Sequence, residues 1–279
     1  MARYKNLFAA VFATAAITLS GCGNSPVPTD GLPAETTAAV TTTVGTTTAE
    51  TSAEEKTVNK VRTAEELAGK KVIALTFDDG PNTGVTGEII DIAGQYGIKV
   101  SFFVVGQEIT PESAEMMKRA YSLGCEINSH SYTHSDMTTL DADTIKEEMR
   151  KTAELIYDTV GEYPHFFRPP YISVNSTMYE CIDLPFISGI GCNDWEDDVS
   201  VEKRVRFLTQ KCSDGEIVLL HDQKTNEKTA EAVRQAVPVL LEQGFEFVTV
   251  SELFAAKGIT PSSTDEIIYN FATVSGQKE

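Results

Sequence analysis

Two acidic residues and two histidines have the types and the spacing of a divalent-metal site. Asp78 and Asp79 end the apolar run Val72–Phe77, and His130 and His134 stand four residues apart further along the chain. Two imidazoles and one carboxylate leave coordination positions open on a zinc-like ion, which is typical of a catalytic metal. The second carboxylate is then free to act as a base.

Each half of this pattern has a simpler explanation when it is taken alone. Asp79 precedes Gly80, and an Asp-Gly turn that merely ends a strand would look the same. His130 and His134 lie one turn apart if their segment is helical, so that both imidazoles can face one ion, and a chance pair of histidines is the alternative. The metal site therefore needs partners elsewhere in the chain.

Three later segments supply candidate partners. Arg168 stands before two prolines, which would hold it rigidly near a carboxylate and present the amide of Tyr171 to a ligand. In the segment Asp194-Trp195, the only tryptophan would make an apolar wall, and Leu219-Leu220-His221 offers a proton donor. A structural histidine at a strand end is the alternative for His221.

The intervening sequence predicts a parallel sheet wrapped by helices, closed or nearly closed into a barrel. Seven β-rich runs alternate with helix-like stretches. The runs are Val72–Phe77, Val100–Val105, Cys125–Ser129, His165–Arg168, Phe186–Gly191, Glu216–His221 and Phe245–Val250. The helix-like stretches are Thr86–Tyr96, Pro111–Leu123, Ala142–Val160, Asn175–Cys181, Ser200–Cys212 and Glu227–Gln243. All five chemistry-bearing segments follow strands, at the carboxyl end where α/β barrels place active sites.

Taken in order, the five segments resemble the five motifs of the polysaccharide deacetylase family, also called the NodB-homology family or carbohydrate esterase family 4. The resemblance covers about Lys71 to Lys257. The matching segments are Thr76–Gly80, His130–His134, Arg168–Tyr171, Gly191–Trp195 and Leu219–His221. The fourth motif departs from the family pattern, because Gly191 stands where an aspartate is usual. That departure puts the loop architecture or the substrate preference in doubt more than catalysis.

The resemblance implies a distorted (β/α) barrel of about seven parallel strands that hydrolyses acetyl groups with one divalent metal ion, usually zinc. It implies that Asp79, His130 and His134 bind the metal and that Asp78 takes a proton from metal-bound water. His221 would protonate the leaving group.

Further residues receive supporting roles from the same resemblance. Arg168 is expected to orient Asp78 and keep it ionised, and Asp194 is expected to favour the imidazolium of the catalytic histidine. The backbone N–H of Tyr171 would help to hold the oxyanion. Trp195 and Leu219 are expected to line the substrate site.

The first residues of the chain resemble an export signal. Arg3 and Lys5 precede the apolar stretch Leu7–Leu19, and Leu19-Ser20-Gly21-Cys22 resembles a bacterial lipobox. We expect residues 1–22 to form a signal peptide and a lipidated Cys22 to anchor the protein on the extracellular face of the bacterial cell membrane. An ordinary secretory peptide cut near Ala15 is the alternative.

Composition divides the rest of the chain. Residues 23–70 are threonine-rich and predict a disordered linker, residues 71–258 predict the catalytic domain, and residues 259–279 form a tail that either packs or hangs free. The formal net charge of -18 would become two units more negative without Arg3 and Lys5, which disfavours nucleic acid as a partner. We expect a monomer by default. Four cysteines, Cys125, Cys181, Cys192 and Cys212, leave their pairing open.

The leading hypothesis is a metal-dependent deacetylase that removes N-acetyl groups from a polysaccharide containing N-acetylglucosamine, above all peptidoglycan, because the expected anchor lies beside the cell wall. The same motifs serve O-acetyl esterases acting on acetylxylan, which is the alternative among enzymes. A non-catalytic glycan-binding surface protein is the alternative of a different class, and the intact set of Asp78, Asp79, His130, His134 and His221 argues against it.

Overall fold

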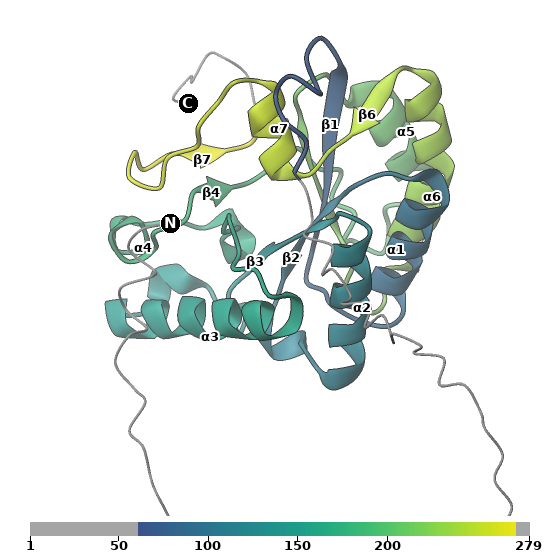
Figure 1. The fold of residues 1–279 in the computed structure, drawn as a ribbon. Coiled ribbons are helices and arrows are strands. Elements are labelled where there is room, and N and C mark those ends of the chain that lie inside the picture. Colours follow the sequence, from purple (N-terminus) through teal and green to yellow (C-terminus); the bar gives the residue numbers. More distant parts are fainter. Residues whose placement is uncertain (1–60, 272–279) are drawn as a thin grey trace, which may run out of the picture. The chain divides into compact units, whose positions relative to one another are not determined.

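The computed structural model describes residues 61–271, so the predictions for the signal peptide, Cys22 and most of the linker lie outside the described residues. Strands and helices alternate along most of this range (Figure 1). The strands are β1 (Lys71–Asp78), β2 (Ser101–Val104), β3 (Glu126–Ser129), β4 (Phe186–Ile187), β5 (Ile217–His221), β6 (Phe245–Phe247) and β7 (Ile268–Tyr269). The α-helices are α1 (Val85–Tyr96), α2 (Pro111–Ser122), α3 (Ala142–Val160), α4 (Ser176–Cys181), α5 (Val201–Lys211), α6 (Glu227–Glu242) and α7 (Val250–Ala256).

A parallel sheet forms the centre of the fold. Its strands follow the order β3-β2-β1-β5, and β6 pairs with the first residues of β1. Single parallel bridges continue from Ser129 to Phe167, from Phe167 to Phe186 and from Ile190 to Val218. Parallel pairing thus runs from β3 through β4 to β5, which confirms the predicted α/β fold with a parallel sheet curved in the manner of a barrel.

Three predicted strands are shorter than expected. The run Phe245–Val250 keeps only Phe245–Phe247, because Thr249 caps α7, which begins at Val250. The run His165–Arg168 pairs at Phe167 alone, because Pro169 has no N–H to continue the ladder beyond Arg168. The run Phe186–Gly191 keeps only two strand residues, since the chain changes partner within it: the Ser188 N–H donates to Tyr269 O of β7, and the Ile190 N–H donates to Ile217 O of β5. The tail therefore packs through β7, which pairs with β4, as far as Phe271, which bridges to Glu216.

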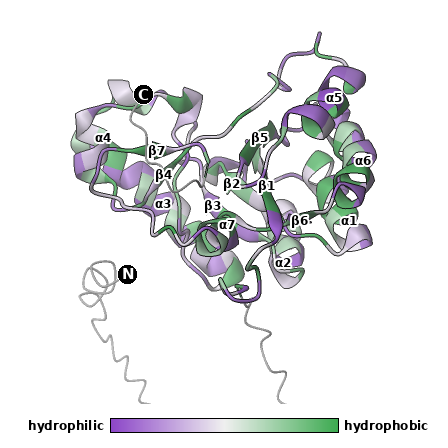
Figure 2. Ribbon diagram, turned by 90° about the horizontal axis from the view of Figure 1, so that it is seen from above, coloured by the Kyte–Doolittle hydropathy of each residue, from purple (hydrophilic) through white to green (hydrophobic). Residues whose placement is uncertain are grey.

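β1 is the central strand, and every residue after Lys71 in it is buried. Ile73, Leu75 and Phe77 point to one side and join a cluster with α1, α2 and α6, whereas Val72 and Ala74 point to the other side and pack against Phe103, Phe166, Ile187 and Ile217. Burial on both faces accounts for the continuous apolar run in the sequence. Figure 2 shows hydrophobic residues gathered around β1 and along α6.

Helix ends follow the capping signals in the sequence. The Thr110 hydroxyl accepts from the Ser113 N–H at the start of α2, with Pro111 in the first turn. Gly161 ends α3 in the left-handed region, and Gly124 and Gly244 have positive φ just beyond α2 and α6. Among the described residues, no helix is both long enough and apolar enough to cross a membrane.

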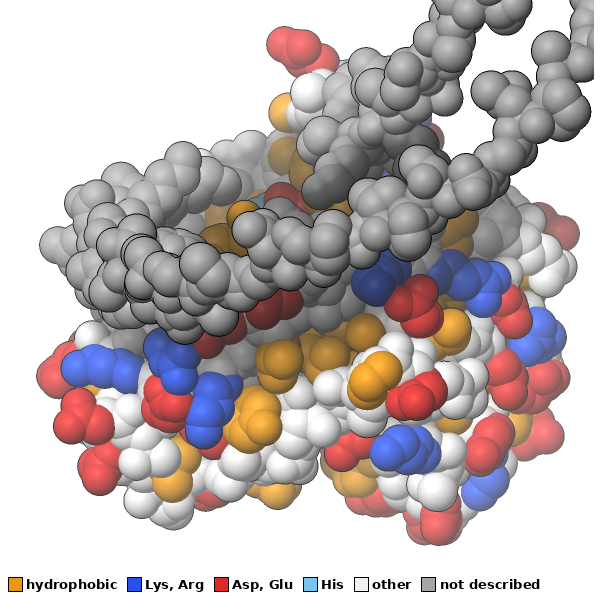
Figure 3. Space-filling view, turned by 60° about the horizontal axis from the view of Figure 1, so that its bottom comes forward, with side chains coloured by type: hydrophobic (Ala, Val, Ile, Leu, Met, Phe, Trp, Pro, Cys, Tyr) orange, Lys and Arg blue, Asp and Glu red, His pale blue; other side chains and the backbone are white. Residues whose placement is uncertain are grey.

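The surface carries both signs of charge. On the face that Figure 3 presents, Asp and Glu side chains are interspersed with Lys and Arg. On α3, for example, Arg150 donates to both Glu147 and Glu154. Such exposed pairs are screened by solvent and add little to stability.

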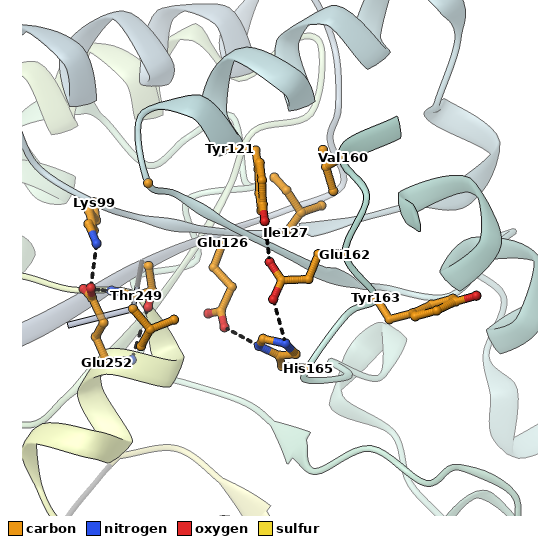
Figure 4. Close-up of a pocket in the computed structure, with 12 residues that line it drawn as sticks. Lys99, Tyr121, Glu126, Ile127, Val160, Glu162, Tyr163, His165, Thr249 and Glu252 are labelled. Carbon is orange, nitrogen blue, oxygen red and sulfur yellow. Dashed lines mark hydrogen bonds and ion pairs between the residues drawn. The ribbon is translucent and has the colours of Figure 1, made fainter. Parts of the chain in front are cut away.

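The fourth histidine, which belongs to none of the motifs, ties together the amino-terminal side of the sheet (Figure 4). His165 Nδ1 lies 3.5 Å from Glu126 Oε1, and Nε2 lies 3.2 Å from Glu162 Oε1. Glu162 also accepts from the Tyr121 hydroxyl of α2, and Glu126 accepts the Val250 N–H at the start of α7. The hydrogen bonds to Glu126 and Glu162 raise the pKa of His165 to about 10, although burial opposes them.

We predict that the charge of His165 stabilises the fold in a defined pH range. Its folded pKa of about 10 exceeds the ordinary 6.5, so this stability is complete below 6.5 and is lost as pH rises through 10. His165→Gln should lower the free energy of unfolding by about 2 kcal/mol at slightly acidic pH. The deficit measured by urea denaturation should shrink as pH approaches 10; a deficit independent of pH would rule out the imidazolium charge as its source.

Candidate active site

One cleft lies at the carboxyl ends of the strands. Its volume is about 670 Å³. The predicted site residues that line it are Asp78, Asp79, His130, His134, Tyr171, Trp195, Leu219 and His221. Arg168 and Asp194, the other two predicted site residues in the described range, are fully buried and contact residues of the cleft from behind. The structure therefore brings together all of the predicted site residues except Cys22, which lies outside the described residues.

Three ligand atoms converge at the end of β1. Asp79 Oδ1 lies 3.5 Å from His130 Nε2 and 3.3 Å from His134 Nε2. Asp79, His130 and His134 form a group with the ligand types and spacing of a metal site. Asp79 Oδ1 is buried and has no hydrogen-bond partner among the described residues. A buried carboxylate oxygen without a partner is costly, and a cation held by these three side chains would satisfy it.

The state of His130 suits a metal ligand. Its Nδ1 lies 2.7 Å from the carbonyl oxygen of Arg168, which can only accept, so Nδ1 carries the proton and Nε2 presents its lone pair toward Asp79. Burial lowers the pKa of His130 to about 3, although the charge of Asp79 opposes it. The imidazole is thus neutral at ordinary pH, as metal binding requires.

The segment from His130 to His134 is a loop, so the helical arrangement that would place the two histidines one turn apart does not occur. Ser131 and His134 have φ of 66° and 58°, which no α-helix permits. The carboxylate of Glu148 on α3 accepts the backbone N–H groups of Tyr132 and Thr133 at 2.9 and 2.8 Å. The loop, rather than a helix, brings the two rings to a centroid separation of 4.8 Å.

Asp78 and Arg168 form a buried ion pair. Arg168 Nη1 lies 2.6 Å from Asp78 Oδ1 and also donates to the hydroxyl of Thr76, while Nη2 donates to Ser188 O. The guanidinium lies over the ring of Phe103 at 4.1 Å. Burial raises the pKa of Asp78 above its ordinary value, and Arg168 lowers it in opposition. A carboxylate with a raised pKa is a stronger base, and one held by Arg168 has a fixed orientation.

His221 is held by Asp194. The Nδ1 of His221 lies 2.8 Å from Asp194 Oδ1, and the backbone N–H of His221 donates to Oδ2 at 2.9 Å. Burial lowers the pKa of His221, but the hydrogen bond and charge of Asp194, with the charges of Asp78 and Asp79, outweigh it and raise the pKa above 6.5. With Nδ1 engaged, Nε2 is the atom left to exchange a proton. The Trp195 ring meets the imidazole edge-on at 5.0 Å.

Asp222 is a buried residue of the site that sequence reasoning missed. Its carboxylate accepts from the Gly80 N–H and from the Thr86 hydroxyl, and its backbone N–H donates to Asp78 O. It thereby holds the turn that presents Asp79. A Cβ at Gly80 would lie 2.5 Å from Asp222 Oδ2, so glycine is required there. The position of this aspartate directly after His221 was the one available sequence signal.

Backbone strain is concentrated around the cleft. Of the seven non-glycine residues with positive φ among the described residues, five line the cleft: Asp79, His134, Tyr171, Ile172 and Asn193. Left-handed non-glycine residues cost about 1–3 kcal/mol each and persist only where surrounding contacts enforce them. Tyr171, with φ of 58°, is also two-thirds exposed and meets the His134 ring edge-on at 4.9 Å.

Comparison with known proteins gives a consistent set of relatives. The family model described as polysaccharide deacetylase matches residues 66–183. A bifunctional xylanase/deacetylase of Pseudobutyrivibrio xylanivorans is 47% identical over 193 residues, which are 69% of this chain and 32% of that protein. The peptidoglycan-N-acetylglucosamine deacetylase PgdA of Listeria monocytogenes is 33% identical over 203 residues, 71% of this chain and 42% of that protein. The chain thus spans less than half the length of these two relatives.

A solved structure matches over nearly its whole length. The family 4 acetyl xylan esterase of Clostridium thermocellum, solved in complex with a cobalt ion, is 36% identical with a TM-score of 0.70. The match covers 72% of this chain and 98% of that one.

We predict that Glu148 supports metal binding although it does not touch the ligand atoms. Glu148→Gln replaces a charged acceptor of two N–H groups with a neutral one and loosens the loop that carries His134. Metal affinity should fall by about 10- to 100-fold in a calorimetric titration with Zn²⁺. Glu147→Gln, a change at a partly exposed position one residue earlier on α3, is the matched control and should bind as the parent does. Equal affinities for all three proteins would contradict the role of Glu148.

Proposed function

The chain belongs to the polysaccharide deacetylase family, and from this premise we propose that it removes acetyl groups from a polysaccharide, with Asp78 as general base and His221 as general acid. The observation that carries the proposal is a base and an acid in one cleft, each held by its own buried partner of opposite charge. Arg168 fixes the carboxylate, and Asp194 favours the imidazolium.

Enzymes of this family use a divalent metal, and the residues present fit one. We propose that Asp79, His130 and His134 hold it and that it is Zn²⁺ in this protein, since two imidazoles and a carboxylate suit that ion. When bound, the ion lowers the pKa of water and polarises the acetyl carbonyl.

The remaining steps belong to side chains of the cleft. Asp78 accepts the proton of the attacking water, and Arg168, bonded to Oδ1, keeps the carboxylate in place so that Oδ2 can receive the proton. His221 donates from Nε2 to the leaving oxygen or nitrogen, because Nδ1 is engaged with Asp194. The backbone N–H of Tyr171 is proposed to stabilise the oxyanion, and Trp195 and Leu219 to orient the sugar.

Two substrates are candidates, and the relatives favour O-acetylated xylan. Its support is the 47% identity with a xylanase/deacetylase and the 36% identity with an acetyl xylan esterase, against 33% with the peptidoglycan deacetylase. Peptidoglycan, favoured in the sequence analysis, is the second candidate. It is supported by the lipobox-like segment at Cys22, through which we propose that the protein is anchored outside the cell.

Replacing the proposed base should separate catalysis from metal binding. Asp78→Asn keeps the size of the side chain but cannot accept the proton, so acetate release should fall by about 10³-fold or more while metal content is unchanged. His130→Ala should lose both. Acetate release and metal content are measured on the same preparations of each variant. Near-normal turnover by Asp78→Asn would show that Asp78 is not the base.

Comparison of substrates tests the function itself. We expect the metal-loaded protein to release acetate from acetylxylan faster than from N-acetylglucosamine oligomers or peptidoglycan, with Asp78→Asn as the blank. Release from the N-acetylated polymers alone would establish the second candidate. Glycan binding without acetate release from any of them would instead indicate a non-catalytic surface protein.

A further inference from the structure

Arg204, on α5, is a buried arginine outside all five motifs. It is 1% exposed. Among the described residues its guanidinium makes four hydrogen bonds, and every acceptor is neutral: Val199 O, Glu196 O, Asn226 Oδ1 and Thr229 Oγ1. A buried cation without a directly bonded anion is costly, so its counter-charge must lie nearby.

That counter-charge is Asp194, which is connected to Arg204 through one bridging side chain. Arg204 Nη1 lies 2.7 Å from Thr229 Oγ1, and Thr229 Oγ1 lies 2.6 Å from Asp194 Oδ2. Arg204 Nη1 also donates to Asn226 Oδ1 at 2.5 Å, and Asn226 Nδ2 lies 3.4 Å from Asp194 Oδ2. Two neutral side chains at the start of α6, which packs against α5, therefore bridge a buried cation and a buried anion (Figure 1).

The direction of every proton in this network is fixed by chemistry. Arginine can only donate and an ionised carboxylate can only accept, so the Thr229 hydroxyl must point its hydrogen at Asp194. The same constraint places the Asn226 oxygen toward Arg204 and its amide nitrogen toward Asp194. Asp194 also accepts from Nδ1 of His221, so the donors from Thr229 and from the imidazole meet at this carboxylate.

We propose that Arg204 is a positioning residue for His221, acting through Thr229 and Asn226 on Asp194. This rests on the proposed function of His221 as proton donor. The network holds Asp194 ionised and in one place, and it moderates how strongly that carboxylate retains the imidazolium proton. Without it, Asp194 would hold the proton more firmly.

Other charged groups also act on His221. From the end of β1, Asp78 and Asp79 favour its imidazolium, as Asp194 does from the loop between β4 and α5. Arg168 is paired with Asp78, and Asp222 follows His221 directly. The Arg204 network lies behind Asp194, and Thr229 and Asn226 can be changed without altering any of these charges.

The test is a titration of His221 by histidine side-chain NMR in the full chain, which has only four histidines. Thr229→Val is nearly isosteric and removes one donor to Asp194, and Arg204→Gln removes the charge. Each should move the midpoint of His221 upward by about half a pH unit. The alkaline limb of kcat/KM against pH should move with it, with little change in KM.

Three controls separate this role from a merely structural one. Thr229→Ser restores the hydroxyl and should restore the midpoint, and Arg206→Gln, an exposed change on the same helix, should leave it unmoved. Asp194→Asn should move it downward. An unmoved or lowered midpoint in folded Thr229→Val would overturn the proposal. If no glycan yields acetate, the proposed function fails, but the NMR titration still decides whether Arg204 acts on His221.

Discussion

The buried ion pair between Arg168 and Asp78 is the interaction on which the rest of the site depends. Removing one partner of such a pair typically costs about 3–5 kcal/mol, because it strands the other charge away from water. Arg168 also acts through its backbone: its carbonyl oxygen accepts from His130 Nδ1, and its N–H donates to Ser129 O. One residue thus orients the proposed base and a candidate metal ligand together, so the two cannot move independently.

The same arrangement recurs around the cleft, where each functional side chain is held by a buried polar group from a distant part of the chain. Glu148 holds the histidine loop, Asp222 holds the turn after β1, and Asp194 holds His221. These contacts also account for the left-handed backbone of Asp79 and His134, since strained conformations persist only when several interactions enforce them. Rigidity of this kind is what a preorganised site requires.

The sequence predicted local features well and long-range ones poorly. The run before Asp78 is apolar because both faces of β1 are buried, and Thr110 and Gly161 mark helix ends through backbone chemistry that is local. The five motifs located the cleft, because carboxyl ends of parallel strands meet at one edge. His130 and His134 suggested a helix because spacing reports periodicity and cannot report a carboxylate on α3. Glu148 and Asp222 act largely by accepting backbone N–H groups, which almost any residue supplies, so they belong to none of the five motifs. The exception is Gly80, where the close approach of Asp222 excludes a side chain.

The order of the strands along the chain also determines which parts of the site can form first during synthesis. Asp79, His130 and His134 are all synthesised before Arg168, and β1 finds its neighbours β5 and β6 only after about two-thirds of the described chain has followed it. Pairings between such distant segments form slowly, because closing the long intervening loop costs conformational entropy before any contact between the strands stabilises it. The metal ligands and the base Asp78 therefore exist in the growing chain long before Arg168, which orients the base, and before the acid His221 and the outer strand β7. A newly made chain has ligands for an ion well before it can use one.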